Sequence, residues 1–228
     1  MKSLRQLLLT LCLAAAFASC QQHYPPLPPT SQFFALCDFS TGNLIFIRDT
    51  TGMGSAIQSA TTLDIHQSAF THVAITECTD SGVFVIDATP ALGVARRPLN
   101  DFIAAVYDTN SDYSFTSMAQ YYYVDVPYDT ATLLARLHAL VGLPYDPYFL
   151  PHNGRLYCSE LVQDCFLDPE GNPLFPSKPM NFLASDGTLP PYWQHHFDSL
   201  GTAVPQGTPG TNPNDMSRSP ILHPFKIQ

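Results

Sequence analysis

The chain has 228 residues and a formal net charge of −9, from 10 Lys and Arg against 19 Asp and Glu. It carries no basic patch or stripe, so we expect no nucleic-acid partner. Apolar residues make up 45% of the chain and charged residues 13%, which is typical of a globular protein with a buried core.

The N-terminus has the pattern of an export signal. In residues 1–19, Lys2 and Arg5 precede an apolar run that ends in small residues, which predicts a secretory signal peptide. The segment "AFASC" resembles a bacterial lipobox, which predicts cleavage before Cys20 and a lipid on its thiol. Ordinary cleavage nearby without a lipid is the alternative. With the lipid, the protein is a membrane-anchored lipoprotein of the cell envelope, in the periplasm or on the cell surface.

A proline-rich tether follows the predicted cleavage site over residues 20–32, because its composition favours an extended chain. We expect residues 33–228 to form a single domain. Five segments are rich in β-branched and aromatic residues and bounded by turn residues, which predicts strands at 43–49, 70–78, 83–90, 93–102 and 120–127. The segment 93–102 comprises a short strand and the turn that follows it. The turn "TDSG" makes the second and third of these a hairpin.

Two helices are predicted in the second half of the chain. Residues 128–142 place leucines at helical spacing behind Asp129, a residue type that caps helices. A second helix begins near Tyr157. Residues from about 168–228 are rich in Pro, Gly and Asn, and we expect an ordered extension that wraps around the domain. The fold class is therefore α+β, a small antiparallel sheet or barrel packed against a few helices.

Cys158 stands at the first turn of the second predicted helix, after the loop "NGRLY". A helix N-terminus presents free N–H groups and a partial positive charge, and both favour a thiolate over a thiol. The same N–H groups can hold an oxyanion. Cys158 is therefore a candidate nucleophile. The alternative is a small buried residue, the role expected of Cys165, which shares an interior helix face with Leu161 and Val162.

A cysteine hydrolase also needs a histidine base on an element that faces the cysteine. The chain has eight histidines. His72 opens a predicted strand after a loop, which is a suitable position, whereas His152 lies on the loop that enters the cysteine helix. His138 is in the middle of a helix, and His195, His196 and His223 lie in the C-terminal extension. Residue type alone leaves this choice open.

Five segments that resemble those of a known family occur in this order along the chain: "TGNLIFIRD", "FTHVAI", "VIDATPALGVARRPLNDF", "GLPYDPYF" and "YCSELVQDCF". Together they resemble the circularly permuted papain-fold cysteine hydrolases of the NlpC-related superfamily, in the YiiX and YaeF-like branch of predicted amidases. The resemblance spans Gly42 to Phe166 and implies a permuted papain-like fold, with the histidine strand before the cysteine helix. Asn43 stands where the family has Asp. The tail from Tyr192 resembles the C-terminal extension of exported Bacteroides-type members.

The resemblance implies roles for three residues. Cys158 would be the nucleophile and His72 the general base. The orienting acid of this branch lies in a V-I-E-A-type segment, which reads "VIDA" here and assigns the role to Asp87. Glu77 is the competing acid, although strand alternation points its side chain to the face opposite His72. The choice depends on the register of the hairpin.

Tyr145, in "LPYD", and Tyr157 are candidates for lining the cleft or completing the oxyanion hole, with packing as the alternative. The resemblance implies a cysteine amidase or peptidase that cleaves an amide bond of a cell-wall peptide, without a metal or organic cofactor. Three alternatives stay open: a hydrolase of lipid amides or esters, an acyltransferase, and a non-catalytic peptide-binding module on the same scaffold.

Overall fold

The computed structural model describes residues 39–49, 52–61, 69–109 and 118–227, with the backbone alone at 107–109. The predicted signal peptide, the predicted lipid attachment site Cys20 and the predicted tether lie outside the described residues. Within the described ranges, no helix is long and apolar enough to cross a membrane.

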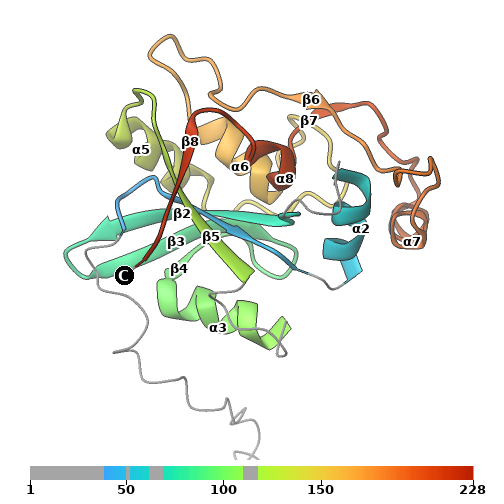
Figure 1. Ribbon diagram of the computed structural model, residues 1–228, viewed down its shortest axis with the longest axis horizontal. Helices are drawn as coiled ribbons and strands as arrows, with labels where there is room; N and C mark the ends of the chain where they lie inside the picture. Colours follow the sequence, from blue (N-terminus) through green and yellow to red (C-terminus); the bar gives the residue numbers. More distant parts are fainter. Residues whose placement is uncertain (1–38, 50–51, 62–68, 110–117, 228) are drawn as a thin grey trace, which may run out of the picture. The chain divides into compact units, whose positions relative to one another are not determined.

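A six-stranded antiparallel sheet forms the centre of the fold, in the order β4–β3–β2–β1–β5–β8 (Figure 1). Its strands in chain order are β1 (Leu44–Ile47), β2 (His72–Thr79), β3 (Gly82–Thr89), β4 (Gly93–Pro98), β5 (Ala119–Val124) and β8 (Leu222–Phe225). The first five coincide with the predicted strands. The sixth, β8, comes from the C-terminal extension, where the sequence predicted no strand. A separate two-stranded sheet pairs β6 (Lys178–Pro179) with β7 (Pro209–Gly210).

Six helices surround the sheet in the described part of the chain: α2 (Gly52–Thr61), α3 (Leu99–Thr109), α5 (Thr130–Leu140), α6 (Cys158–Cys165), α7 (Pro191–Leu200) and α8 (Pro213–Met216). The sequence predicted α5 and α6. In α5, the Asp129 side chain accepts hydrogen bonds from the backbone N–H groups of Ala131 and Thr132, as expected of a cap. The fold is α+β, as predicted.

Helix α3 replaces the turn that the sequence predicted after β4. Its first residue follows Pro98 directly, and it buries Phe102 and Ile103 against the sheet. The extension likewise contains a helix, α7, which begins at Pro191 and ends before Gly201 in the left-handed conformation. Proline at the start and glycine just past the end are helix signals that were present in the sequence.

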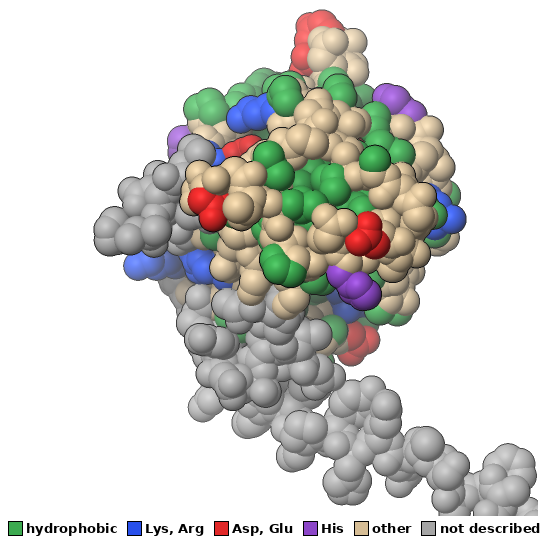
Figure 2. Space-filling model, turned by 90° about the vertical axis from the view of Figure 1, so that its right-hand side faces the viewer, with side chains coloured by type: hydrophobic (Ala, Val, Ile, Leu, Met, Phe, Trp, Pro, Cys, Tyr) green, Lys and Arg blue, Asp and Glu red, His purple; other side chains and the backbone are tan. Residues whose placement is uncertain are grey.

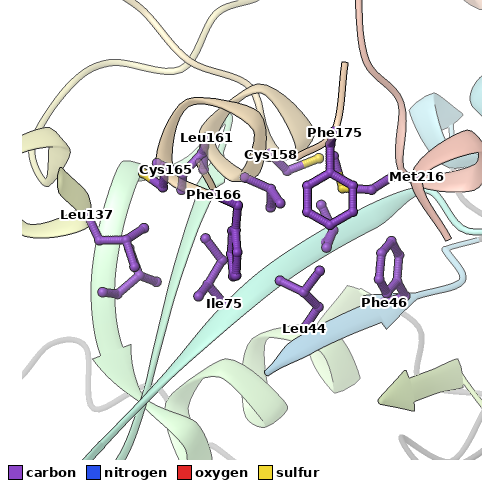
Figure 3. Close-up of a cluster of buried hydrophobic side chains, with 14 of the residues drawn as sticks. Leu44, Phe46, Ile75, Leu137, Cys158, Leu161, Cys165, Phe166, Phe175 and Met216 are labelled. Atoms are coloured by element: carbon purple, nitrogen blue, oxygen red, sulfur yellow. The ribbon is translucent and has the colours of Figure 1, made fainter. Parts of the chain in front are cut away.

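The sheet is covered on both faces. Helices α5 and α6 lie on one side and α3 on the other (Figure 1). Because successive strand residues point to opposite faces, β2 gives Ile75 to the α5–α6 side and Ala74 to the α3 side. On the α5–α6 side, Ile75 packs in one buried cluster with Leu137 and Leu161 (Figure 3).

The loop after α5 is fixed to the edge of the sheet. The Val94 N–H donates to the Leu143 carbonyl at 2.8 Å, and the Gly142 N–H donates to the Val94 carbonyl at 2.8 Å. Gly93 has a φ of 68°, and a Cβ at this position would collide with the Leu143 carbonyl oxygen. Glycine therefore allows the close approach that leads the chain on to Tyr145.

We expect Gly93→Ala to destabilise the protein more than Gly142→Ala. Both glycines have a left-handed backbone conformation, with φ of 68° at Gly93 and 95° at Gly142. A non-glycine residue in this conformation costs about 1–3 kcal/mol of backbone strain. Only at Gly93 does the new Cβ also meet backbone, whereas the space around Gly142 is open. Urea unfolding should show a loss near 1 kcal/mol for Gly142→Ala and about 3 kcal/mol for Gly93→Ala. Equal losses would contradict the close approach.

Candidate active site

The β2–β3 register brings His72 and Asp87 together. The hairpin pairs Ile75 with Ile86, and the same register places Asp87 opposite Ala74, diagonal to His72 on one face of the sheet. His72 Nε2 lies 2.8 Å from Asp87 Oδ2. The side chain of His72 is 21% exposed, and that of Asp87 is 1% exposed.

Arg97 of β4 is the second partner of Asp87. Its Nη2 donates to Asp87 Oδ2 at 2.8 Å. The Arg97 guanidinium lies 5.1 Å from the ring centroid of Phe102 in α3, and the His72 ring stacks on the same phenyl ring at 6.4 Å. The Asp87 carboxylate thus binds both the Arg97 guanidinium and the His72 imidazole, and the Phe102 ring of α3 packs against both of these groups.

Cys158 is the first residue of α6 and is 7% exposed. It lines a cavity of about 580 Å³ together with His72, Asp87 and Tyr145. Because His72 Nε2 contacts Asp87, Nδ1 is the ring nitrogen left to exchange a proton with the thiol. The helix N-terminus, the imidazole and the carboxylate therefore meet at one cavity wall.

Burial by itself would lower the pKa of His72. The charge of Cys158 and the hydrogen bonds of the ring to Asp87 and Cys158 outweigh burial, and they raise this pKa to about 10 from the ordinary 6.5. The environment of His72 therefore favours the imidazolium form of its ring.

Glu77 lies on the other face of β2 and does not contact His72. Its Oε2 accepts from Arg96 Nε at 2.7 Å, and its Oε1 lies 3.1 Å from His138 Nε2. Burial opposes ionisation, but the hydrogen bonds from Arg96 and His138 lower the pKa of Glu77. Glu77 therefore links β2 to β4 through Arg96 and to α5 through His138.

Two other histidines, His152 before α6 and His196 in the extension, lie away from the cavity that Cys158 and His72 share. His152 is exposed, with a φ of 58°, and its charge acts on Asp164. His196 Nε2 lies 2.7 Å from the Pro147 carbonyl oxygen, where it fastens α7 to the loop before α6. Neither lines the cavity that Cys158 shares with the imidazole of β2.

The two tyrosine candidates occupy different places. Tyr145 lines the cavity, and its hydroxyl donates to the Met53 sulfur at 3.7 Å. Burial and then the charge of Cys158 raise the pKa of Tyr145 well above its ordinary value, so the hydroxyl keeps its proton. Tyr157 does not line that cavity but borders a smaller one of about 40 Å³, which Tyr145 and Cys158 also border. The Tyr157 hydroxyl accepts a hydrogen bond from the Thr211 N–H at 3.1 Å, which attaches the extension.

Sequence reasoning missed Arg97 and Glu160. Arg97 lies in one of the matching segments, but the sequence does not indicate its role, because only the β3–β4 register shows what it contacts. Glu160, in the first turn of α6, accepts a hydrogen bond from the Tyr157 N–H. Burial, followed by the charges of Asp164 and Asp146, raises the pKa of Glu160 to about 8. At neutral pH it is therefore mainly uncharged and does not oppose a thiolate at the helix start.

Comparison with known proteins places this arrangement in a family. Residues 38–224 match the family described as permuted papain-like amidase enzyme, YaeF/YiiX, C92 family, and the chain belongs to it. The predicted resemblance and permuted papain-like fold are thus confirmed. Membership supports a cysteine hydrolase of the amidase type in general. No curated protein matches the chain.

A solved structure is similar in fold. It is YiiX from Escherichia coli O157:H7, described as a metalloprotein, with a TM-score of 0.63 and 21% identity over 83% of this chain and 97% of that one. At this identity the likeness shows the fold alone. In the part of the present chain that the structure describes, no group of three or more His, Cys, Asp or Glu could hold a metal ion.

We expect Arg97→Met to lower the free energy of unfolding at pH 7 by about 3 kcal/mol, because it removes the arginine that pairs with the buried Asp87 carboxylate. The double variant Asp87→Asn/Arg97→Met should be more stable than Arg97→Met alone, since its buried amide carries no charge. Urea unfolding of the two single variants and the double variant measures the coupling. A double variant as unstable as the sum of the singles would show that the pair is not coupled.

Proposed function

We propose that the protein is a cysteine amidase in which Cys158 is the nucleophile, His72 the general base and Asp87 the orienting acid. The observation that carries this proposal is the 2.8 Å contact of His72 Nε2 with Asp87 Oδ2, at a cavity wall that Cys158 shares. A nucleophile at a helix N-terminus, a base beside it and an acid behind the base are the parts that covalent acyl transfer needs.

The reaction proceeds in two steps. The Cys158 thiolate attacks the carbonyl carbon of the amide, and the C–N bond breaks as the His72 imidazolium gives its Nδ1 proton to the leaving amine. A water molecule then loses a proton to His72 and attacks the thioester. The carboxylic acid product leaves, and the thiolate–imidazolium pair is restored.

The oxyanion of each tetrahedral intermediate needs at least two donors. The backbone N–H of Cys158, at the first position of α6, is free of the helical hydrogen-bond ladder and supplies one. The Tyr145 hydroxyl supplies the second. Its present acceptor is the Met53 sulfur at 3.7 Å, and thioether sulfur is a weak acceptor, so an oxyanion replaces it at little cost.

The setting of the enzyme follows from the predicted export signal. With a lipid on Cys20, the domain is tethered to a membrane of the bacterial cell envelope, where cell-wall peptides and lipid amides are the accessible amide substrates. An acyltransferase would use the same acyl-enzyme and differ only in the acceptor. A peptide-binding module without turnover is disfavoured, because all three polar positions carry chemically competent groups.

Alkylation by iodoacetamide tests the activated nucleophile. We expect Cys158 to react much faster than Cys165 at about pH 7, because the imidazolium of His72 favours a thiolate. Burial raises the pKa of the control, Cys165, to about 12. Mass spectrometry of the alkylated peptides gives both rates in one sample. In His72→Ala the advantage of Cys158 should shrink by at least about tenfold. Equal labelling of Cys158 in the parent protein and in His72→Ala would reject the ion pair.

A second experiment separates the two acids. Asp87→Asn should lower kcat for a chromogenic amide by roughly 10²-fold or more, because the imidazole loses the charge that orients it and stabilises its protonated form. Glu77→Gln, the matched amide substitution on the other face of β2, should leave kcat within about threefold and act on stability instead. The reverse pattern would transfer the orienting role to Glu77.

A further inference from the structure

Cys158 borders two cavities. Besides the large cavity that it shares with His72, it borders a small one of about 40 Å³, which α2, α7, the loop before α6 and the extension enclose. Tyr145 borders both cavities, whereas His72 is absent from the described lining of the small one. A volume of this size takes a group of about two to four non-hydrogen atoms. Such a group would lie directly beside the thiol, on the side away from the imidazole.

Two buried polar atoms of the small cavity's wall have no hydrogen-bond partner among the described residues. They are Trp193 Nε1 and Thr211 Oγ1, on residues that are 2% and 7% exposed. Unpaired buried donors are costly, so they point to a group that pairs with them on binding. Thr211 also borders a cavity of about 360 Å³ within the extension, but of these three cavities Trp193 borders only the small one. The indole N–H is therefore a donor for a group in the small cavity.

Contacts within the protein hold both donors in place. The Trp193 ring packs edge-on against Phe149 and Phe182, with ring centroids 5.5 and 5.2 Å apart. The Thr211 N–H donates to the Tyr157 hydroxyl at 3.1 Å, which fixes the backbone beside the threonine side chain. Side chains that are locked by packing and hydrogen bonds before a ligand arrives are typical of a binding site.

The rest of the lining selects an uncharged group. The Thr61 hydroxyl already donates to the Ile57 carbonyl at 2.8 Å, and Asn181 Nδ2 donates to the Ala60 carbonyl at 2.8 Å. None of the described lining residues is Asp, Glu, Lys, Arg or His. Figure 2 shows the side of the molecule where α2 and α7 lie, and hydrophobic side chains gather near its middle with few charged ones among them. A charged group would be desolvated without a counter-ion, while the indole N–H requires an acceptor.

We propose that the small cavity is a subsite for the acyl part of the substrate, which selects short, uncharged acyl groups that carry a hydroxyl or a carboxamide. The proposal rests on the proposed amidase function and narrows its substrate class. His72 gives its proton to the leaving amine and lines the large cavity, so the amine lies on that side of Cys158 and the acyl group on the other. The acyl substituent's oxygen accepts from Trp193 Nε1, and the Thr211 hydroxyl supplies a second hydrogen bond.

The test uses the full-length protein and three aminocoumarin amides that differ in one terminal group: those of 3-hydroxypropanoic, butanoic and 3-aminopropanoic acid. We expect kcat/KM for the hydroxylated amide to exceed that for the butanoyl amide by about 25-fold, or about fivefold for each of two hydrogen bonds. It should exceed the aminated amide by about 100-fold, because the ammonium is desolvated without a counter-ion. A butanoyl amide that is cleaved equally fast or faster would overturn the proposal.

Three variants locate the hydroxyl group. Thr211→Val and Trp193→Phe each remove one hydrogen-bonding atom and should each lower the preference for the hydroxylated over the butanoyl amide by about fivefold. Thr61→Val is the matched control, because it borders the same cavity but its hydroxyl is already bonded to Ile57, and it should keep the preference. Thr211→Val removes an unpaired buried hydroxyl, so its melting temperature should not fall. A preference that all three variants lose equally, or that all three keep, would overturn the assignment.

Binding to Cys158→Ala keeps the inference testable without turnover. Trp193 is the single tryptophan of the chain, so one indole N–H resonance reports on the cavity. Titration of the ¹⁵N-labelled protein with 3-hydroxypropanamide should move this resonance downfield, because the N–H gains an acceptor, whereas butanamide should leave it in place.

The two proposals fail in different ways. If the indole resonance moves as expected but no amide is cleaved and Cys158 is not activated, the proposed amidase function fails and the subsite stands. If amides are cleaved without regard to the terminal group, and the two ligands move the resonance equally or not at all, the subsite fails and the amidase stands.

Discussion

The buried carboxylate of Asp87 constrains the rest of the site. A carboxylate without water costs several kcal/mol unless it is paired and hydrogen-bonded, and here the partners are His72 of β2 and Arg97 of β4, on the strands either side of β3. If the register of the β2–β3 or β3–β4 hairpin shifted by one residue, the Asp87 carboxylate would point to the apolar core on the other face of the sheet, or it would lose His72 or Arg97 as a partner. The requirement to neutralise one charge therefore fixes the register of three strands and the orientation of the imidazole. The Phe102 ring beneath both partners makes α3 part of the same arrangement.

The two buried acids, Glu77 of β2 and Asp87 of β3, lie on opposite faces of the sheet and have different partners. Glu77 faces α5, where Arg96 and His138 bind it and fasten a helix to the sheet. Asp87 faces α3, where its charge acts on His72. Both acids are buried and both pair with an arginine of β4. What separates a structural carboxylate from one that acts on the imidazole is therefore the parity of its position along the strand, which decides what else it touches.

The site combines a polar end with apolar walls, and different parts of the chain supply them. The sheet and α6 hold His72, Asp87 and Cys158 at positions fixed by backbone hydrogen bonds. Helix α3, the β3–β4 turn and the extension supply the walls, with Tyr192 of α7 lining the cavity and β8 completing the sheet. In this arrangement the sheet and α6 fix the positions of His72, Asp87 and Cys158, while α3, the β3–β4 turn and α7 set the size and polarity of the cavity.

The sequence by itself determined the features that rest on local patterns. Alternation and turn residues gave the β2–β3 hairpin, a capping Asp129 gave α5, and a cysteine after a glycine loop gave the start of α6, because each signal lies within a few residues of what it specifies. The tertiary structure decided the rest. Helix α3 follows a strand without a capping residue, and β8 contains Pro224, which is tolerated because β8 is an edge strand. The geometry that favours Asp87 over Glu77 came from the register between strands, and register is a relation between distant segments that no local pattern contains.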